Sequence, residues 1–348
     1  MRVYAGLDVS LKTTQICVVD VDGKVFWRGV SPSDPVSIHL ALARHLPDLE
    51  RCVLETGSTS PWLANGLRGL GVPVVVADAR LAHPILKTMR NKTDRNDARV
   101  LADLARTNMF RAVYVKPRQA QELRAALVGR QQLVEVSADL KNSIRGLLKP
   151  FGLIPGKGSG QVFVRLVREK LEGARALSAV IEPLLAALTA VRKQLAGTTK
   201  ALLDFARGNA ICRRLMTMPG VGALVAVAYL STVCEPARFG KSRDVGAHLG
   251  LTSRRQQSGE VDVQGRITAK GDELLRSLLY EAAGVMLFRW TGKCALKEWA
   301  ARLVPVKGTG KARVALARKM AVVLHEMWEH GLNFDPKGKP AQPAAHAA

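Results

Sequence analysis

The order of the apolar segments in the first third of the chain limits the folds that the chain can adopt. The pair Asp22-Gly23 separates two short apolar segments and is a strong signal for a two-residue hairpin turn. Strands are predicted at residues 3–9, 14–19, 24–27, 51–55 and 72–76, and helices at about 36–46 and 61–70. Three leading strands, followed by alternating helices and strands, predict a mixed sheet covered by helices.

The same element order is typical of the RNase-H-like nuclease fold. We therefore expect residues 1–112 to form an α/β domain of this class. The chain has 348 residues, of which 47% are hydrophobic, and this is enough for more than one domain.

The charge of the chain points to a polyanionic partner. Its formal net charge is +23, and nearly all of the basic excess lies after residue 106. Nucleic acid is the natural partner for such a surface, with an anionic membrane as the competitor. The longest apolar stretches, such as residues 223–230, are too short to cross a bilayer, and the N-terminus has no signal-peptide pattern. We expect no membrane association and a cytoplasmic, nucleoid-associated location.

Cysteine and histidine chemistry is not indicated. The five cysteines are scattered, with no C-x-x-C pair and no histidine at zinc spacing, and the seven histidines are dispersed. A structural zinc site and a Cys/His nucleophile are therefore not predicted.

Two long segments with helical periodicity follow the first domain. Leucines and isoleucines repeat at helical spacing from about residue 119 to 149, and a second periodic stretch runs from about 161 to 205 after a glycine-rich break. We expect residues 113–207 to form an antiparallel helical, coiled-coil arm. Such arms more often pack or dimerise than catalyse reactions, and these helices are the expected contact of a homodimer or homotetramer.

The last part of the chain is predicted to be mostly α-helical. A Pro-Gly-x-Gly turn at residues 218–222 precedes a helix at 223–232, and it either presents Gly220 and Gly222 to a phosphate or merely connects two helices. Further helices are predicted at about 240–249, 272–288 and 311–331. We expect residues 208–331 to form a C-terminal domain, with a disordered tail at 332–348.

Four carboxylates of the N-terminal region are placed at predicted strand ends or on one face of a predicted helix. Asp8 ends the first strand, Glu55 ends the fourth, and Asp94 and Asp97 lie on one face of a helix. Taken singly, each has an ordinary structural explanation, as a turn or as a helix cap. Together they would converge at one sheet edge, and oxygen donors in such an arrangement suit two Mg²⁺ ions that act on a phosphodiester.

Ser258 is a candidate nucleophile. It is followed by a glycine and preceded by Arg254 and Arg255, in a segment predicted to be a loop between helices. A serine needs a nearby base or metal to attack a phosphate, and arginines would stabilise the charge that develops. An exposed loop serine is more often only a loop residue.

Other residues were assigned to phosphate contacts from their composition and context. The predicted nucleic-acid-binding set is Lys92, Arg95, Gly220, Gly222, Arg254, Arg255, Lys270, Arg276, Lys311, Arg313, Arg318 and Lys319. None of the glycine-rich segments has the G-x-x-x-x-G-K-[ST] order, so no nucleotide triphosphate site is predicted.

Six segments carry a resemblance to a known family through their order and spacing. They are Gly6-Leu7-Asp8-Val9-Ser10, Leu54-Glu55-Thr56-Gly57, Lys92-Thr93-Asp94-Arg95-Asn96-Asp97-Ala98, Met218-Pro219-Gly220-Val221-Gly222, His248-Leu249-Gly250-Leu251-Thr252 with Ser258-Gly259, and Ala315-Leu316-Ala317-Arg318-Lys319-Met320. In these segments the chain resembles the DEDD-type insertion-sequence transposases with a RuvC-like N-terminal domain. That group includes the bridge-RNA-guided serine recombinases and the related pilin-gene invertases.

The resemblance implies a composite active site. It implies that Asp8, Glu55, Asp94 and Asp97 bind Mg²⁺ and that Ser258 forms a covalent link to DNA. It also implies a non-coding guide RNA that pairs with double-stranded donor and target DNA, so that base pairing supplies sequence choice. The family often has a second glycine after Ser-Gly, where this chain has Glu260.

Three functions are compatible with these features. The first is a transposase or recombinase that excises and inserts an insertion-sequence element by DNA cleavage and strand exchange. The second is a RuvC-like endonuclease that uses water alone, for which Ser258 would be incidental. The third is a non-enzymatic nucleic-acid-binding scaffold, in which the acids are structural.

Overall fold

The computed structural model describes residues 1–78, 94–259 and 261–337, and it leaves the side chains of Asp94 and Gln264 undescribed. The chain forms two compact units, Met1–Pro117 and Arg118–Ala348. The predicted further division after residue 207 stays a prediction. Among the described residues, no helix combines the length and the apolar composition needed to cross a bilayer.

The first unit contains the predicted mixed sheet. Its strands are β1 (Val3–Val9), β2 (Thr13–Asp20), β3 (Val25–Pro32), β4 (Leu49–Glu55) and β5 (Val74–Ala77), in the order β3-β2-β1-β4-β5. The β1–β2 and β2–β3 pairs are antiparallel, whereas β1–β4 and β4–β5 are parallel. The prediction of a mixed sheet is confirmed.

Local sequence signals explain the turns of this unit. The Asp20 carboxylate accepts the backbone N–H groups of Asp22 and Lys24 at 3.0 and 2.8 Å, and Gly23 takes φ +82°. A positive φ suits glycine, so the β2–β3 hairpin turns where it was predicted. Asp34 caps the next helix by accepting the N–H of Ser37 at 2.9 Å.

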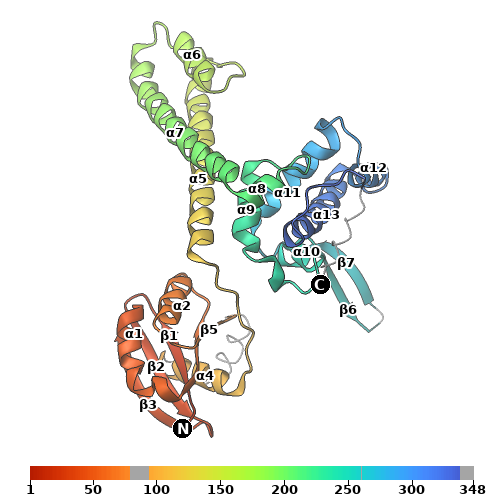
Figure 1. Cartoon of the computed structure of the whole chain (residues 1–348). Coiled ribbons are helices and arrows are strands. Elements are labelled where there is room, and N and C mark those ends of the chain that lie inside the picture. The colour runs from red at the N-terminus through yellow and green to blue at the C-terminus, as the bar shows by residue number, and fades with distance from the viewer. Residues whose placement is uncertain (79–93, 260, 338–348) are drawn as a thin grey trace. The chain divides into compact units, whose positions relative to one another are not determined.

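Helices cover both faces of the sheet (Figure 1). Helices α1 (Pro35–Leu42) and α2 (Ser60–Gly69) pack on one face, where the core includes Leu7 and Leu54. Helix α4 (Asp94–Thr107) packs on the other face, where the core includes Val53 and Leu101. A short 3₁₀ helix, Ala43–Asp48, leads into β4.

Gly6 allows α4 to lie directly on the sheet. A Cβ atom at this position would overlap the backbone of Ala98, Leu101 and Ala102 in α4. Only glycine permits this approach. Gly6 therefore fixes where along β1 the helix crosses the sheet.

The second unit begins with a long helical arm (Figure 1). Helices α5 (Arg118–Leu148) and α7 (Arg175–Gly208) lie side by side, and α6 (Gln161–Lys170) packs near the tip. Buried apolar residues join the three helices, among them Ile144, Phe163 and Leu185. The stretch predicted as one helix from 161 to 205 is broken after α6, because Gly173 takes φ +83°.

The remaining helices of this unit surround a second apolar core. They are α8 (Ala210–Leu215), α9 (Ala223–Val233), α10 (Asp244–His248), α11 (Glu273–Gly284), a π-helical turn at Val285–Arg289, α12 (Ala295–Lys307) and α13 (Thr309–Glu329). Helix α9 is almost entirely buried at the centre of this core. The fully buried Tyr229 donates its hydroxyl to the Ala321 carbonyl of α13 at 2.7 Å. This hydrogen bond links the two helices without leaving the phenol unsatisfied.

Two helix predictions need correction. The helix predicted at 240–249 is only the short α10, because residues 236–243 are used in a 3₁₀ turn and in backbone turn bonds such as Asp244 N–H to Lys241. Helix α12 was not predicted, since Pro305 falls within it.

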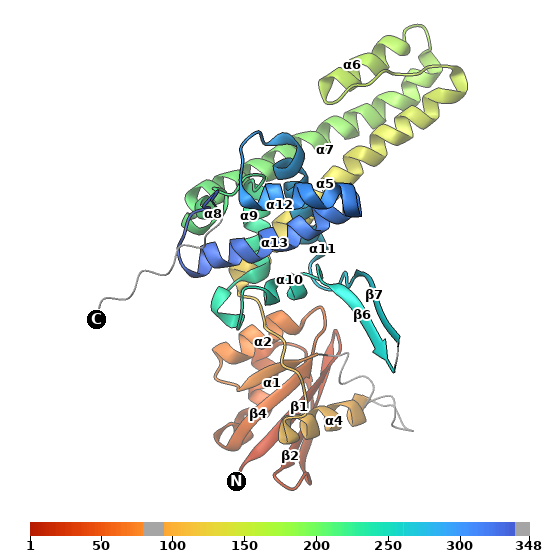
Figure 2. The same ribbon diagram turned by 90° about the vertical axis from the view of Figure 1, so that its right-hand side faces the viewer.

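The segment around Ser258 is a β-hairpin, so the prediction of a loop between helices is wrong. Strands β6 (Ser253–Ser258) and β7 (Val261–Ile267) pair in antiparallel fashion and extend from the helices of the second unit (Figure 2). Every residue of β6 is exposed, so the segment lacks the apolar alternation that reveals a strand in a sequence.

The end of the described chain is held against the second unit. The N–H of Phe334 donates to the Thr217 hydroxyl at 2.9 Å, and the Phe334 ring packs on the core. The rest of the predicted disordered tail, residues 338–348, lies outside the described residues.

We expect Gly6→Ala to destabilise the first unit by about 1–3 kcal/mol, because the new methyl group forces α4 away from β1. Hydrogen exchange should accelerate in β1 and α4 and stay unchanged in the second unit. Gly69→Ala is the control: it adds a methyl group to α2 with no heavy atom within 4 Å. Equal exchange in the two variants would contradict the packing role of Gly6.

Candidate active site

Asp8 and Glu55 lie side by side at one edge of the sheet. Leu7 pairs with Leu54 across the parallel strands β1 and β4, and the next residue on each strand is an acid. Because side chains alternate between faces, both acids leave the sheet on the side opposite to Leu7 and Leu54, which is the side that α4 covers. Both are half-buried.

Helix α4 starts over the same edge. Its middle residues cross Gly6, and the Ala105 carbonyl near its C-terminal end accepts a hydrogen bond from Arg51 near the start of β4, at 2.9 Å. The helix therefore runs antiparallel to β1 and β4, and its first turn lies above the strand ends that carry Asp8 and Glu55.

Asp97 occupies this first turn. It is half-buried and lies one helical turn before Leu101, which packs against Val53 of β4. The backbone of Asp94 begins the helix, but its side chain lies outside the described part of the chain. The structure thus brings the elements that carry all four predicted acids to one face of one sheet edge.

The donor chemistry of this edge suits a divalent cation. Carboxylate oxygens are the ligands that Mg²⁺ and similar hard cations take in proteins. Among the side chains that the structure describes, no three His, Cys, Asp or Glu residues are close enough to hold a metal ion. The Asp94 carboxylate is not part of that comparison.

Ser258 lies at the tip of the β6–β7 hairpin. It is exposed and pairs with Val261, next to Gly259 at φ +55°. Glu260, the residue at which this chain departs from the family pattern, lies outside the described residues. A hydroxyl at an exposed tip is accessible to a large substrate.

The two arginines beside Ser258 differ in their contacts. Arg255 makes a two-pronged ion pair with Asp262 on β7, at 2.8 and 2.7 Å, and its hydrogen bond lowers the pKa of that carboxyl. Arg254 is exposed and donates a hydrogen bond to the Thr268 carbonyl at 3.4 Å. Arg255 therefore braces the hairpin, and the phosphate contact of Arg254 stays a prediction.

The two predicted glycine contacts have different surroundings. A Cβ at Gly220 would overlap the Ala282 carbonyl of α11, and Gly220 takes φ +85°. Close packing therefore explains this glycine without a phosphate. Gly222 is exposed and caps the N-terminus of α9.

Three predicted cations make contacts within the second unit. Arg276 donates to the carbonyls of Leu249 and Lys270 at 3.3 and 3.2 Å. Arg313 lies over the Tyr280 ring at 3.7 Å, and Lys319 over the Trp299 ring at 3.8 Å. These contacts give each of them a structural role.

The remaining predicted cations are more accessible. Lys270, Lys311 and Arg318 are exposed in the second unit. Arg95 is exposed on α4, and Lys92 lies outside the described residues. Sequence reasoning passed over Arg28 and Gln15, which lie beside Arg95 on the sheet, because neither belongs to a charged or glycine-rich motif.

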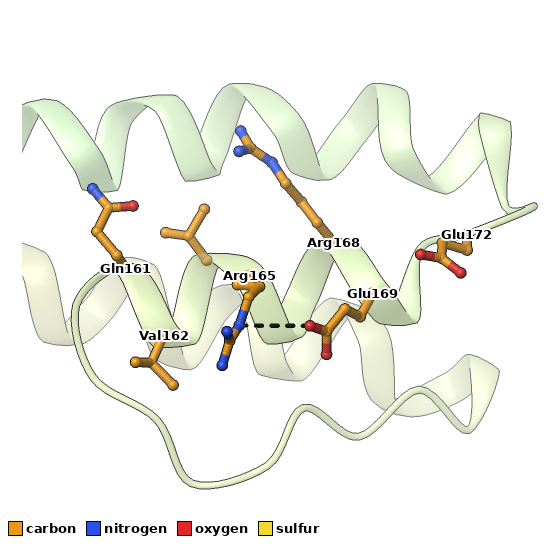
Figure 3. Close-up of a pocket in the computed structure, with 7 residues that line it drawn as sticks. Gln161, Val162, Arg165, Arg168, Glu169 and Glu172 are labelled. Atoms are coloured by element: carbon orange, nitrogen blue, oxygen red, sulfur yellow. Dashed lines mark ion pairs between the residues drawn. The ribbon is translucent and has the colours of Figure 1, made fainter.

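A hollow of about 450 Å³ lies along α6 at the arm (Figure 3). Both of its described arginines are paired: Arg165 contacts Glu169 at 3.6 Å, and Arg168 contacts Glu182 of α7 at 2.9 Å. Because these glutamates compensate the charges of the two arginines, the hollow is a poor binding site for a phosphate.

Comparison with known protein families accounts for both units. Residues 5–152 match a family described as a transposase, the DEDD transposase of IS110 elements. Residues 212–300 match the family described as "Transposase IS116/IS110/IS902 family". The first match covers the sheet and the four predicted acids, and the second covers the hairpin with Ser258.

Full-length relatives agree with these matches. The transposase for insertion sequence element IS1111A of Coxiella burnetii is 30% identical over 328 residues, which cover 92% of this chain and 87% of that protein. A probable family 20 transposase of Pseudomonas aeruginosa is 28% identical over 325 residues, which cover 92% and 94%. The transposase for IS1328 of Yersinia enterocolitica is 24% identical over 300 residues, which cover 85% and 89%. The chain therefore belongs to the IS116/IS110/IS902 family of transposases and is a DNA transposase of the DEDD type.

Proposed function

We propose that this transposase excises and inserts an insertion-sequence element through a Mg²⁺-dependent reaction at the edge of its N-terminal sheet. The convergence of β1, β4 and the first turn of α4 on that edge carries the proposal, because each of the three elements brings acids there. Four acids placed by chance would be scattered over the unit.

The first unit is proposed to be RNase-H-like, of the RuvC type. Its antiparallel β1–β2–β3 meander continues into parallel β4 and β5, with α4 over the β1 face that carries Asp8. The element order predicted a mixed sheet covered by helices, without this strand order. The arrangement of these strands and of α4 supports the RNase-H-like assignment.

In this proposal, Asp8 and Glu55 hold the cations from the sheet, and Asp94 and Asp97 hold them from the helix. When bound, two Mg²⁺ ions would polarise the phosphodiester and stabilise the leaving oxygen.

Ser258 is proposed to act as the nucleophile. Its hydroxyl oxygen attacks a DNA phosphorus atom, forms an O–P bond and gives up its proton, while the bond from phosphorus to a deoxyribose oxygen breaks and that leaving oxygen takes up a proton. Arg254 would then neutralise the charge that builds up on the phosphoryl oxygens. The exposure of the hairpin tip supports this role.

The partners of the reaction are proposed to be double-stranded donor and target DNA, together with a non-coding guide RNA. The net charge of +23 supports binding of this much phosphate. Strand exchange needs several active sites at once, so we propose a homodimer or homotetramer, with the α5–α7 arm as a contact surface. Its place would be the cytoplasm, in association with the nucleoid.

We expect Asp8→Asn and Asp97→Asn each to lower strand cleavage at least about 100-fold, because an amide is a poor ligand for a hard cation. Calorimetric titration with Mn²⁺ should show weaker binding in both. The control is Asp22→Asn, which removes an exposed acid from the β2–β3 turn. Wild-type cleavage and Mn²⁺ affinity in both variants would refute the carboxylate site.

We expect Ser258→Ala to abolish the denaturation-resistant protein–DNA species that forms with Mg²⁺, guide RNA and paired DNA sites, since the variant lacks the attacking oxygen. Ser253→Ala, at the other end of β6, is the matched control and should retain the species. If Ser258→Ala cleaves DNA at the wild-type rate without an adduct, water is the nucleophile and the endonuclease alternative is correct.

A further inference from the structure

A basic hollow lies on the same face of the sheet as Asp8. It has a volume of about 220 Å³ and is lined by Gln15, Ile16, Arg28, Gly29, Val30, Arg95 and Ala98. These residues come from β2, β3 and α4. All belong to the first unit, so the hollow does not depend on any contact with the second.

The strand register places this hollow next to the carboxylates. Gln15 pairs directly with Asp8 across β1–β2, and Val30 pairs with Gln15 across β2–β3. Val30, Gln15, Asp8 and Glu55 therefore form one row across four strands. With strands about 4.8 Å apart, the β3 side of the hollow lies on the order of 10 Å from Asp8.

The described charged residues of the hollow are the cations Arg28 and Arg95. Arg28 is half-buried and pairs with Cys17 across β2–β3. Burial raises the pKa of the Cys17 thiol, and the Arg28 guanidinium partly opposes that rise. Arg95 reaches the hollow from the first turn of α4. Within the described ranges, neither arginine forms an ion pair with an acid, in contrast to Arg99, which pairs with Asp103 at 2.8 Å.

Two guanidinium groups that form no ion pair with a described acid, together with an amide, favour an oxyanion. Arginine recognises phosphate oxygens through two parallel N–H donors, and Gln15 adds a further donor on the side of Asp8. Among the lining residues that the structure describes, none is acidic. The acids and the amide of the row, with the two arginines beside them on the same face, suit a strand that presents successive phosphates.

We infer that the hollow between β2, β3 and α4 binds a backbone phosphate of the DNA strand next to the phosphate held at the carboxylates. The inference rests on the proposed function, because the phosphate in the hollow belongs to the DNA strand that the carboxylates are proposed to cleave. Asp8 and Glu55 would then act on one phosphodiester, while Arg28 and Arg95 fix the direction in which the strand leaves it.

The test is the salt dependence of DNA binding by the full chain in EDTA. The double variant Arg28→Gln/Arg95→Gln should weaken binding about 5- to 10-fold near 0.1 M salt and lower the slope of log K against log salt by about 1. The control, Arg2→Gln/Arg44→Gln, removes the same charge from exposed arginines of the same unit outside the hollow and should leave the slope at the wild-type value.

Equal slopes in the two double variants, or no DNA binding by the wild type, would overturn the inference. Inorganic phosphate is titrated separately. If it binds the wild type but not Arg28→Gln/Arg95→Gln, while the DNA slope is unchanged, the hollow is a free-phosphate site and the DNA assignment is wrong. Binding in EDTA needs no metal, so failure of the carboxylate proposal, seen in Asp8→Asn cleavage, is a separate result.

Discussion

The contact of α4 with β1 at Gly6 is the constraint on which the rest of the first unit depends. Because a side chain at this position would overlap the backbone of Ala98 and Ala102, glycine allows the helix to lie at backbone distance from the sheet. That approach sets the crossing point, and the crossing point sets which strand ends lie beneath the first turn of the helix. The strand ends that carry Asp8 and Glu55 lie under the first turn of α4 as a consequence, and Arg95 lines the neighbouring hollow over β2 and β3.

The second unit depends on a helical core and not on a sheet. Its core is built around the buried α9, and several of its cations brace the fold: Arg276 holds two loop carbonyls, while Arg313 and Lys319 stack on aromatic rings. The hairpin that carries Ser258 lies outside this core, with its first strand entirely exposed. A two-stranded hairpin is only marginally stable by itself in water, so the Arg255–Asp262 pair and a bound nucleic acid would both help to order it.

Sequence patterns were reliable where one local signal controls the structure. The Asp22-Gly23 turn, the order of the strands along the chain and the long α5 helix were all predicted correctly. Turn residues and apolar periodicity are local signals, because they depend on residues that are close in the sequence. They failed where such signals were weak or conflicted. Strand β6 was predicted as a loop because it has no buried face, and α12 was not predicted because it contains Pro305.

The sequence by itself was enough to select the four acids and Ser258 as candidates, to show the basic net charge and to identify the family. These features depend on residue types and on their order along the chain. Only the tertiary structure decided which residues share a face. Gln15 and Arg28 carry no motif, yet the strand register places Gln15 opposite Asp8 and places Arg28 opposite Cys17 on the same face, and the crossing of α4 adds Arg95. Cross-strand register and helix packing are long-range properties, so neighbours along the chain cannot reveal them.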